Sequence, residues 1–229
     1  MKPAMISFMG LDGSGKSTSI EYACAQLKKR GYKVEIVRAA YVVVFLRGVI
    51  KLGKKLLMKK DSDPFSGDYK TYLESLRWNA NKGGAYKIFS FLTTVEFKMQ
   101  IFFQIRLKRF FGTTLLVDRY IYDNIVTYAA NLDLGKEYME ETMNGKWKHA
   151  PRPDQIIYIK TPVAVCCARK DDIPDPLYLQ IREPRYETAA ELYHAVVIAG
   201  DQDKQKMLDA VMAAIDKVLP PLKNTRIEA

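Results

Sequence analysis

Residues 9–17, MGLDGSGKS, hold the side chains with the clearest capacity for chemistry in this chain. They match the spacing G-x-x-x-x-G-K-[ST], and they follow a short apolar run and open a helical pattern, which is the context in which this spacing binds phosphate. Backbone N–H groups at a helix N-terminus would cradle the anion, while Lys16 reaches the β- and γ-phosphates and the Ser17 hydroxyl binds Mg²⁺. The sequence therefore predicts a site for a nucleoside triphosphate with Mg²⁺, formed by Gly10, Gly13, Ser14, Gly15, Lys16, Ser17 and Thr18.

A second motif, LLVDRY at residues 115–120, places a carboxylate and a guanidinium at the end of a predicted buried strand. Ligands bind at the carboxyl ends of the strands in a parallel sheet, so Asp118 is expected near the phosphates. Asp118 could hold Mg²⁺ through water or orient the attacking oxygen, and the planar guanidinium of Arg119 suits a phosphate on the acceptor. An ordinary ion pair at a strand end is the alternative interpretation.

Residues 168–187, ARKDDIPDPLYLQIREPRYE, combine three arginines with three prolines. We expect the prolines to interrupt any helix, so the segment is predicted to be a mobile loop, or lid, over about residues 170–185. Arginines on a lid would supply positive charge where negative charge develops on a transferring phosphoryl group. Arg182 and Arg185 are the candidates for this catalytic role, with Arg169 as a further one, and a solvated loop is the alternative.

Short apolar runs alternate with amphipathic helical stretches along the chain. The runs at 4–9, 33–37, 114–118, 155–160 and 195–199 are predicted strands, and helices are predicted over 16–30, from about 123, from 162 and after 199. Short apolar strands separated by helices form a parallel sheet that is covered on both faces. The predicted fold class is therefore α/β, a three-layer arrangement of about five parallel strands with helices on both faces.

Two helical stretches in the middle of the chain carry unusual surfaces. Residues 42–60 place apolar side chains on one arc and five basic ones on the other, which predicts a basic amphipathic helix. Such a helix either packs on its own protein or lies on an anionic membrane surface. Residues 97–111 are apolar nearly all round, which favours a buried helix, with a subunit interface as the alternative.

The composition suits one globular domain with a basic surface. The chain has 229 residues, of which 48% are hydrophobic and 27% charged, and no apolar run is long enough to span a bilayer. We expect a single domain over 1–229, with a core of 4–169 and 186–218, in the cytosol because no signal-peptide pattern opens the sequence. The net charge of +10 and seven basic residues between 38 and 60 suit either a surface beside the nucleotide or a polyanionic partner, and we expect no nucleic acid.

These motifs together resemble the thymidylate kinases, a family within the nucleoside monophosphate kinases. FMGLDGSGKST matches the family's glycine loop F-x-G-x-D-G-x-G-K-[ST], and residues 118–120 match its acceptor motif D-R-[YFH]. Residues 151–169 resemble the segment P-D-x-x-x-x-L-x-x-x-x-x-x-A-x-x-R that leads into the lid. The likeness runs from about residue 4 to residue 218 and implies a fold of the P-loop NTP hydrolase type.

The resemblance also implies roles for individual residues. Asp12 is expected to contact the acceptor sugar or a metal-bound water, and the absence of arginine from the glycine loop places the catalytic arginine in the lid. Between residues 38 and 111 the chain departs from the family, keeping Arg38 of one motif and placing Lys98 near the arginine of another. The implied acceptor contacts are Asp12, Arg38, Lys98, Arg119, Tyr120 and Asn124, and Arg169 is an implied contact of ATP.

The favoured function is that of an ATP- and Mg²⁺-dependent kinase, similar to thymidylate kinase, that moves the γ-phosphoryl group of ATP to a nucleoside monophosphate, with dTMP as one candidate. A nucleoside kinase or other small-molecule kinase is an alternative, in which Asp118 would deprotonate a hydroxyl. A nucleotide-binding module docked to a membrane or polyanion is another. We also expect a homodimer, and peripheral contact with an anionic membrane through residues 42–60 stays open.

Overall fold

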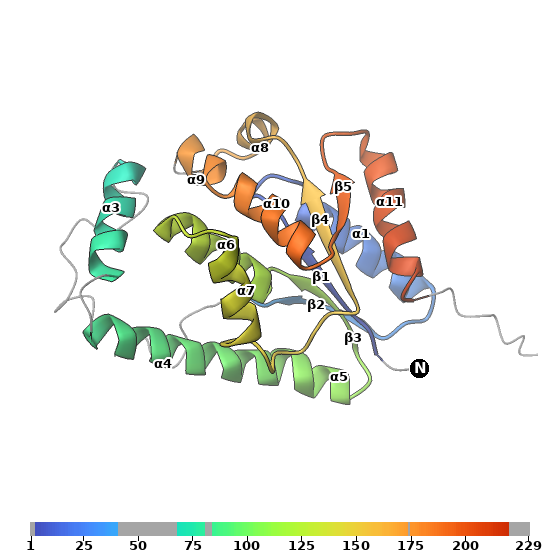
Figure 1. Ribbon diagram of the computed structural model, residues 1–229. Helices are drawn as coiled ribbons and strands as arrows, with labels where there is room; N and C mark the ends of the chain where they lie inside the picture. The colour runs from blue at the N-terminus through green and yellow to red at the C-terminus, as the bar shows by residue number, and fades with distance from the viewer. Residues whose placement is uncertain (1–2, 41–67, 81–83, 174, 220–229) are drawn as a thin grey trace, which may run out of the picture.

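A five-stranded parallel sheet is the centre of the computed structural model, which describes residues 3–40, 68–80, 84–173 and 175–219 (Figure 1). The strand order is β2-β3-β1-β4-β5, so β1 lies in the middle and pairs with β3 and β4. The strands are β1 (Met5–Met9), β2 (Val34–Arg38), β3 (Thr114–Asp118), β4 (Gln155–Lys160) and β5 (Val196–Ala199). The prediction of about five parallel strands is confirmed.

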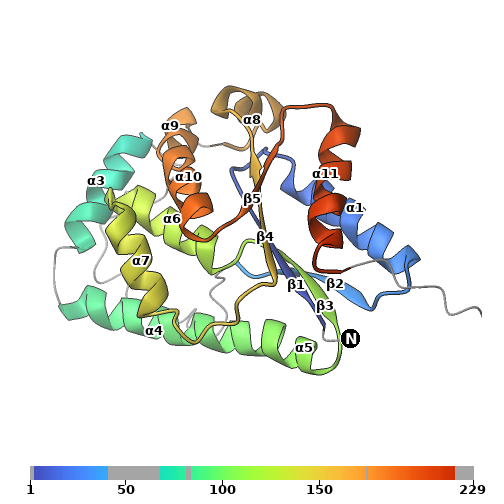
Figure 2. The same cartoon turned by 45° about the vertical axis from the view of Figure 1, so that its right-hand side comes forward.

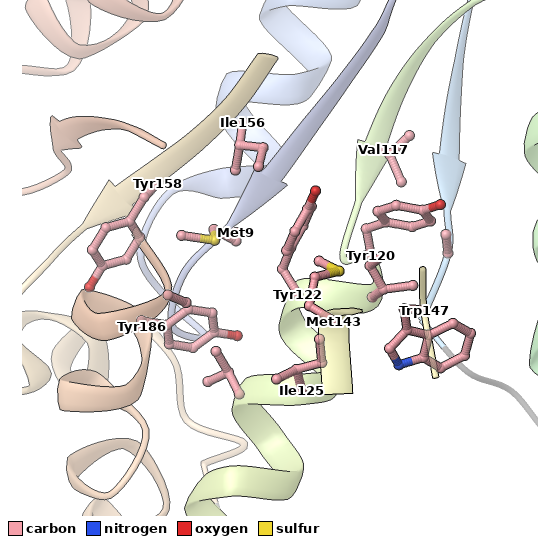
Figure 3. Packing of buried hydrophobic residues seen from close by; sticks show 14 of the residues in the cluster. Met9, Val117, Tyr120, Tyr122, Ile125, Met143, Trp147, Ile156, Tyr158 and Tyr186 are labelled. Carbon is pink, nitrogen blue, oxygen red and sulfur yellow. The ribbon is translucent and has the colours of Figure 1, made fainter. Parts of the chain in front are cut away.

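Helices cover both faces of the sheet, as predicted. Figure 1 shows α1 (Lys16–Lys29) and α11 (Lys204–Asp216) on one side, and α6 (Ile121–Leu132), α7 (Lys136–Asn144) and α10 (Glu183–Leu192) on the other. Successive residues of a strand point to opposite faces, so Ile6 packs with the α1 and α11 side chains, whereas Met5 packs with those of α6 and α7. In the cluster that contains Met5, the Tyr158 and Tyr186 rings stack beside Met9 (Figure 3).

The remaining described helices lie around this three-layer centre. Both views show α4 and α5 as one long rod along the lower edge of the molecule, with α3 beyond its first end (Figures 1 and 2). Phe97 and Ile101 of this rod are buried against the α6 and α7 layer. The bounds of these remaining helices are α3 (Tyr69–Ala80), α4 (Gly84–Ile101), a π-helical turn (Phe102–Leu107), α5 (Lys108–Phe110), α8 (Val163–Arg169) and α9 (Pro176–Gln180).

The second half of the lid segment is largely helical, which corrects part of the expectation of a proline-broken loop, while residues 170–173 and 175 lie outside any helix. Pro176 is the first residue of α9 and Pro184 lies in the first turn of α10. Proline is tolerated there because the first N–H groups of a helix have no intrahelical partner and the fixed φ angle suits a helix start. Asp175 caps α9 through a side-chain oxygen that accepts from the Leu177 N–H. The prolines therefore begin helices in this segment.

The helix predicted to be buried over 97–111 instead exposes much of its apolar surface. We name the apolar stripe as Ile88, Phe91, Val95, Met99, Phe102, Leu107 and Phe110, all of them exposed. Phe110 is 82% exposed. The buried interpretation is thus wrong for this face, and the subunit-interface alternative stays a prediction. The predicted helix at 42–60 lies outside the described residues, and within the described part of the chain no helix has the length and hydropathy to cross a bilayer.

Candidate nucleotide site

The glycine loop connects β1 to α1 and closes over the buried ammonium of Lys16. Gly13 has a φ angle of +83°, and a Cβ atom there would lie 2.6 Å from the Cys166 carbonyl oxygen, so only glycine fits the loop at this point. The Lys16 Nζ donates to the carbonyl oxygens of Gly10 at 2.8 Å and Leu11 at 2.6 Å. Burial lowers the pKa of Lys16 to about 8. The loop thus holds a cation at the start of α1, where the helix N-terminus favours anions.

A cavity of about 580 Å³ opens above this loop at the carboxyl ends of the strands. It combines the loop with residues that follow β2, β3 and β5, which the parallel topology brings to one edge. The predicted residues that line it are Asp12, Gly13, Ser14, Gly15, Lys16, Ser17, Thr18, Arg38, Asp118, Arg119 and Arg169. The fold therefore brings together most of the residues singled out for the nucleotide, although Gly10 contributes only its carbonyl to Lys16.

Asp118 and Ser17 face this cavity with oxygen atoms that suit Mg²⁺. Asp118 Oδ1 is buried and has no hydrogen-bond partner among the described residues, an expensive arrangement unless a cation or water satisfies it. Across the described chain no group of three acidic, histidine or cysteine side chains gathers for a metal. Mg²⁺ needs fewer, because it binds through one or two carboxylates together with waters and substrate phosphates. The pair therefore fits a nucleotide-bound Mg²⁺.

Arg119 lies between two carboxylates beside the glycine loop. Its backbone is left-handed at φ +59°, an uncommon conformation for a side chain of this size. One guanidinium nitrogen pairs with Asp12, and the other lies 4.0 Å from Asp123 Oδ1. Burial opposes the charge of Asp12, but Arg119 and Lys16 outweigh it and hold the pKa of that carboxyl below its usual value. The arginine is thus a partly buried cation that lines the cavity.

A smaller cavity of about 290 Å³ adjoins the first and shares Asp12, Arg38 and Arg119 with it. Lys170 also lines both cavities. Tyr178 of α9 forms part of the wall of the smaller one, and its hydroxyl donates to Asp12 at 3.2 Å. Two adjoining cavities that share Arg38, Arg119 and Lys170 offer positive charge to phosphate groups on either side.

The structure places the two candidate lid arginines away from both cavities. Arg182 is only 4% exposed and its guanidinium stacks over the Tyr178 ring, 3.8 Å from its centroid. The same guanidinium donates to the Tyr69 hydroxyl at 3.0 Å and to the Asn131 amide oxygen at 2.8 Å, which anchors α9 against α3 and α6. Arg185 pairs instead with Asp133 at 2.7 Å. Among Arg169, Arg182 and Arg185, only Arg169 lines the larger cavity, where it donates to the Gly200 carbonyl.

Three residues expected to contact the acceptor lie elsewhere. Lys98 sits on α4 with its Nζ 5.9 Å from the Trp147 ring centroid, a cation–π contact. Tyr120 is fully buried and donates its hydroxyl to the Pro151 carbonyl at 2.9 Å. Asn124 is half-buried on α6 and is not among the described residues that line either cavity.

The sequence interpretation missed several residues of the site. Lys170, Gly200, Gln202, Lys204 and Met207 line the larger cavity, and all but Lys170 follow β5. A glycine and polar residues directly after a parallel strand were the available signal for this loop. Asp123 had no comparable signal, because its burial under Arg119 depends on contacts that only the fold creates.

A glycine loop between the first strand and helix of a parallel sheet, with a buried lysine and a carboxylate on the neighbouring strand, defines a P-loop nucleotide-binding protein. Known proteins agree with this class. A probable thymidylate kinase of Sulfurisphaera tokodaii is 30% identical over 172 residues, which cover 74% of this chain and 71% of that protein. The chain therefore belongs to the thymidylate kinase family.

Two more distant relatives extend the likeness over nearly the whole chain. A thymidylate kinase of Leptospira borgpetersenii is 26% identical over 198 residues, which cover 83% of this chain and 77% of that protein. A probable thymidylate kinase of Archaeoglobus fulgidus is 24% identical over 228 residues, covering 96% and 99%. No protein-family profile matches the chain.

Proposed function

We propose that this protein is an ATP-dependent kinase that transfers the γ-phosphoryl group of ATP to the phosphate of a nucleoside monophosphate. The observation that carries the proposal is the pair of adjoining cavities that share Arg38 and Arg119 in their walls. ATP on the glycine loop and an acceptor phosphate beside these two arginines would face each other. The names of the relatives make dTMP the first acceptor to test.

In this reaction the protein positions charge and supplies little covalent chemistry. Lys16 and the N-terminus of α1 bind the triphosphate, and Arg119 grips the acceptor phosphate. Ser17 and Asp118 would hold Mg²⁺, which would neutralise negative charge on the phosphates. An acceptor phosphate is already ionised, so Asp118 need not act as a general base. The catalytic role expected of a lid arginine is better suited to Arg169, at the end of α8, because Arg169 lines the larger cavity and Arg182 and Arg185 do not.

The domain and its partners belong to the same proposal. We infer one kinase domain over 1–229, with a core of 4–169 and 186–218 and a lid at about 170–185, working in the cytosol. The small-molecule acceptor is its substrate partner, and a second copy of the chain is its protein partner. Membrane contact through residues 42–60 is testable by co-sedimentation with anionic vesicles at low and high salt, because binding through charge weakens with salt.

Measured phosphoryl transfer with a panel of acceptors tests the function. We expect ATP consumption with a nucleoside monophosphate, and at least about a hundredfold less in a Lys16→Ala variant that keeps its melting temperature, because transition-state charge loses its counter-ion. Lys29→Ala, an exposed lysine of the same helix, is the matched control and should retain full activity.

The same panel separates the alternatives. Turnover with nucleosides alone would replace the proposal with a nucleoside kinase. Tight ATP binding without turnover of any acceptor would overturn the kinase proposal and favour a nucleotide-binding module.

A further inference from the structure

Asp123 is a buried carboxylate that the proposed reaction does not use directly. It is 4% exposed and lies in the first turn of α6. Its Oδ2 accepts from the Tyr120 backbone N–H at 3.1 Å, and its Oδ1 accepts from the Tyr186 hydroxyl of α10 at 2.8 Å. The same Oδ1 lies 4.0 Å from a guanidinium nitrogen of Arg119. Burial raises the pKa of this carboxyl, whereas Arg119 and the two hydrogen-bond donors lower it, so its charge depends on these partners.

The two carboxylates next to Arg119 are held very differently. Asp12 belongs to the glycine loop, lines both cavities and also accepts from Tyr178 of the lid. Asp123 lines neither described cavity and is fixed by the helix start and by α10. Each carboxylate faces a different guanidinium nitrogen, Nη2 for Asp12 and Nη1 for Asp123. An arriving phosphate can therefore displace the first contact without disturbing the second.

We propose that Asp123, itself held by Tyr186, is the positioning residue that keeps Arg119 aimed at the acceptor phosphate. This inference rests on the proposed function of Arg119. In the free protein Asp12 occupies the cavity-facing side of the guanidinium, and the acceptor phosphate takes its place on binding. The contact with Asp123 persists in both states and serves as the pivot. Prearranged charge of this kind avoids reordering the side chain during each turnover.

Helix capping is the competing explanation for Asp123. A cap needs only an oxygen that accepts from the Tyr120 N–H, whereas positioning Arg119 needs the negative charge. Asn keeps the shape and one oxygen but removes the charge, so Asp123→Asn separates the two roles. Tyr186→Phe removes the hydroxyl that orients Asp123 and leaves the charge in place.

The experiment measures steady-state kinetics for dTMP and ATP, together with dTMP binding by calorimetry, which needs no turnover. Asp123→Asn should raise the KM and Kd for dTMP about tenfold and leave the KM for ATP within about twofold, because a displaced arginine costs acceptor contacts alone. Tyr186→Phe should change the same constants in the same direction, by less. Asp133→Asn is the matched control, because it neutralises the carboxylate that pairs with Arg185 at the other end of α6.

Each outcome bears on one proposal. Wild-type constants in Asp123→Asn, or equal losses for ATP and dTMP together with a lower melting temperature, would assign Asp123 to capping and overturn the inference. If the wild type binds dTMP but transfers no phosphoryl group, the proposed function fails while the binding comparison still decides the inference. If the wild type does not bind dTMP at all, both dTMP as the acceptor and the inference about Asp123 fail.

Discussion

Lys16 illustrates how single residues of this site are prepared before any ligand arrives. The residue is 6% exposed, and its ammonium rests on two carbonyl oxygens of its own loop, which compensate part of the cost of burying a charge. The compensation is incomplete, since burial still lowers its pKa to about 8. A triphosphate in the cavity would replace the carbonyls with full negative charges and restore the preference for the protonated form.

The first prediction concerns the pH dependence of ATP binding. Because the free protein loses the Lys16 proton as pH rises through about 8, the fraction able to attract phosphate falls above that pH. The Kd for ATP should be flat from pH 6.5 to 7.5 and about tenfold weaker at pH 9. Calorimetry across this range measures it. The arginine of a Lys16→Arg variant does not titrate in this pH range. The same rise in the Kd for ATP in that variant would therefore contradict the explanation.

At the scale of elements, the loop from β5 to α11 is packed directly against the glycine loop. A Cβ atom on Gly200 would lie 2.6 Å from the Ser14 carbonyl oxygen and 2.1 Å from the Thr161 hydroxyl oxygen. That hydroxyl donates to the same Ser14 carbonyl at 3.1 Å. The close approach lets residues after β5 form one wall of the larger cavity. The two loops are therefore in direct contact at Gly200 and Ser14.

Gly200→Ala should disturb both stability and ATP binding. The methyl group has no room, so we expect a loss of about 1–3 kcal/mol in the free energy of unfolding and weaker ATP binding. Gly112→Ala is the control: its φ angle of +78° predicts a comparable cost of about 1–2 kcal/mol, but no atom of the described residues lies within 4 Å of the added carbon. Thermal melts and ATP titrations measure both. Loss of ATP affinity in Gly112→Ala would contradict the assignment to the loop contact.

The sequence predicted the strands better than it predicted the contacts between residues far apart in the chain. The strand at 114–118 was found at its true bounds because a run buried on both faces is continuously apolar. The position of Arg182 could not be predicted, because its partners Tyr69 and Asn131 lie 113 and 51 residues away in the chain. The helices of the lid were missed for a local reason, since Pro176 reads as a breaker unless its place in the first turn is known.

At the scale of the whole molecule, the apolar stripe runs straight along α4 and α5 for about 33 Å. Steps of three and four residues keep its first five members on one face. The step of five from Phe102 to Leu107 spans the π-helical turn, whose longer hydrogen-bond loop returns Leu107 and Phe110 to that face. With Phe103 and Phe111, the exposed phenylalanines present roughly 600 Å², at or above the largest patch of a typical monomer.

This surface suits a second copy of the chain. The stripe has no charged member, as in the core of homodimer interfaces, and a twofold axis across it would bring two identical stripes together. The phenylalanines alone approach the 800 Å² or so that each partner buries in a stable interface.

Light scattering after size exclusion tests the dimer. We expect the wild type at twice 26.2 kDa and a Phe91→Glu/Phe102→Glu variant at 26.2 kDa. Val197→Glu, an equally exposed apolar residue on β5, should leave the mass of the wild type unchanged. A wild-type monomer at the highest soluble concentration would contradict the proposal.

The walls of the larger cavity come from residues far apart in the chain, from Asp12 to Met207. During synthesis the glycine loop leaves the ribosome well before Cys166, Thr161 and Gly200, which pack against it and follow later in the chain. A ligand stabilises a protein only in the form that binds it. ATP can therefore stabilise the finished chain but not a partly synthesised one, so an incomplete copy would gain no protection from the nucleotide and would stay open to proteolysis.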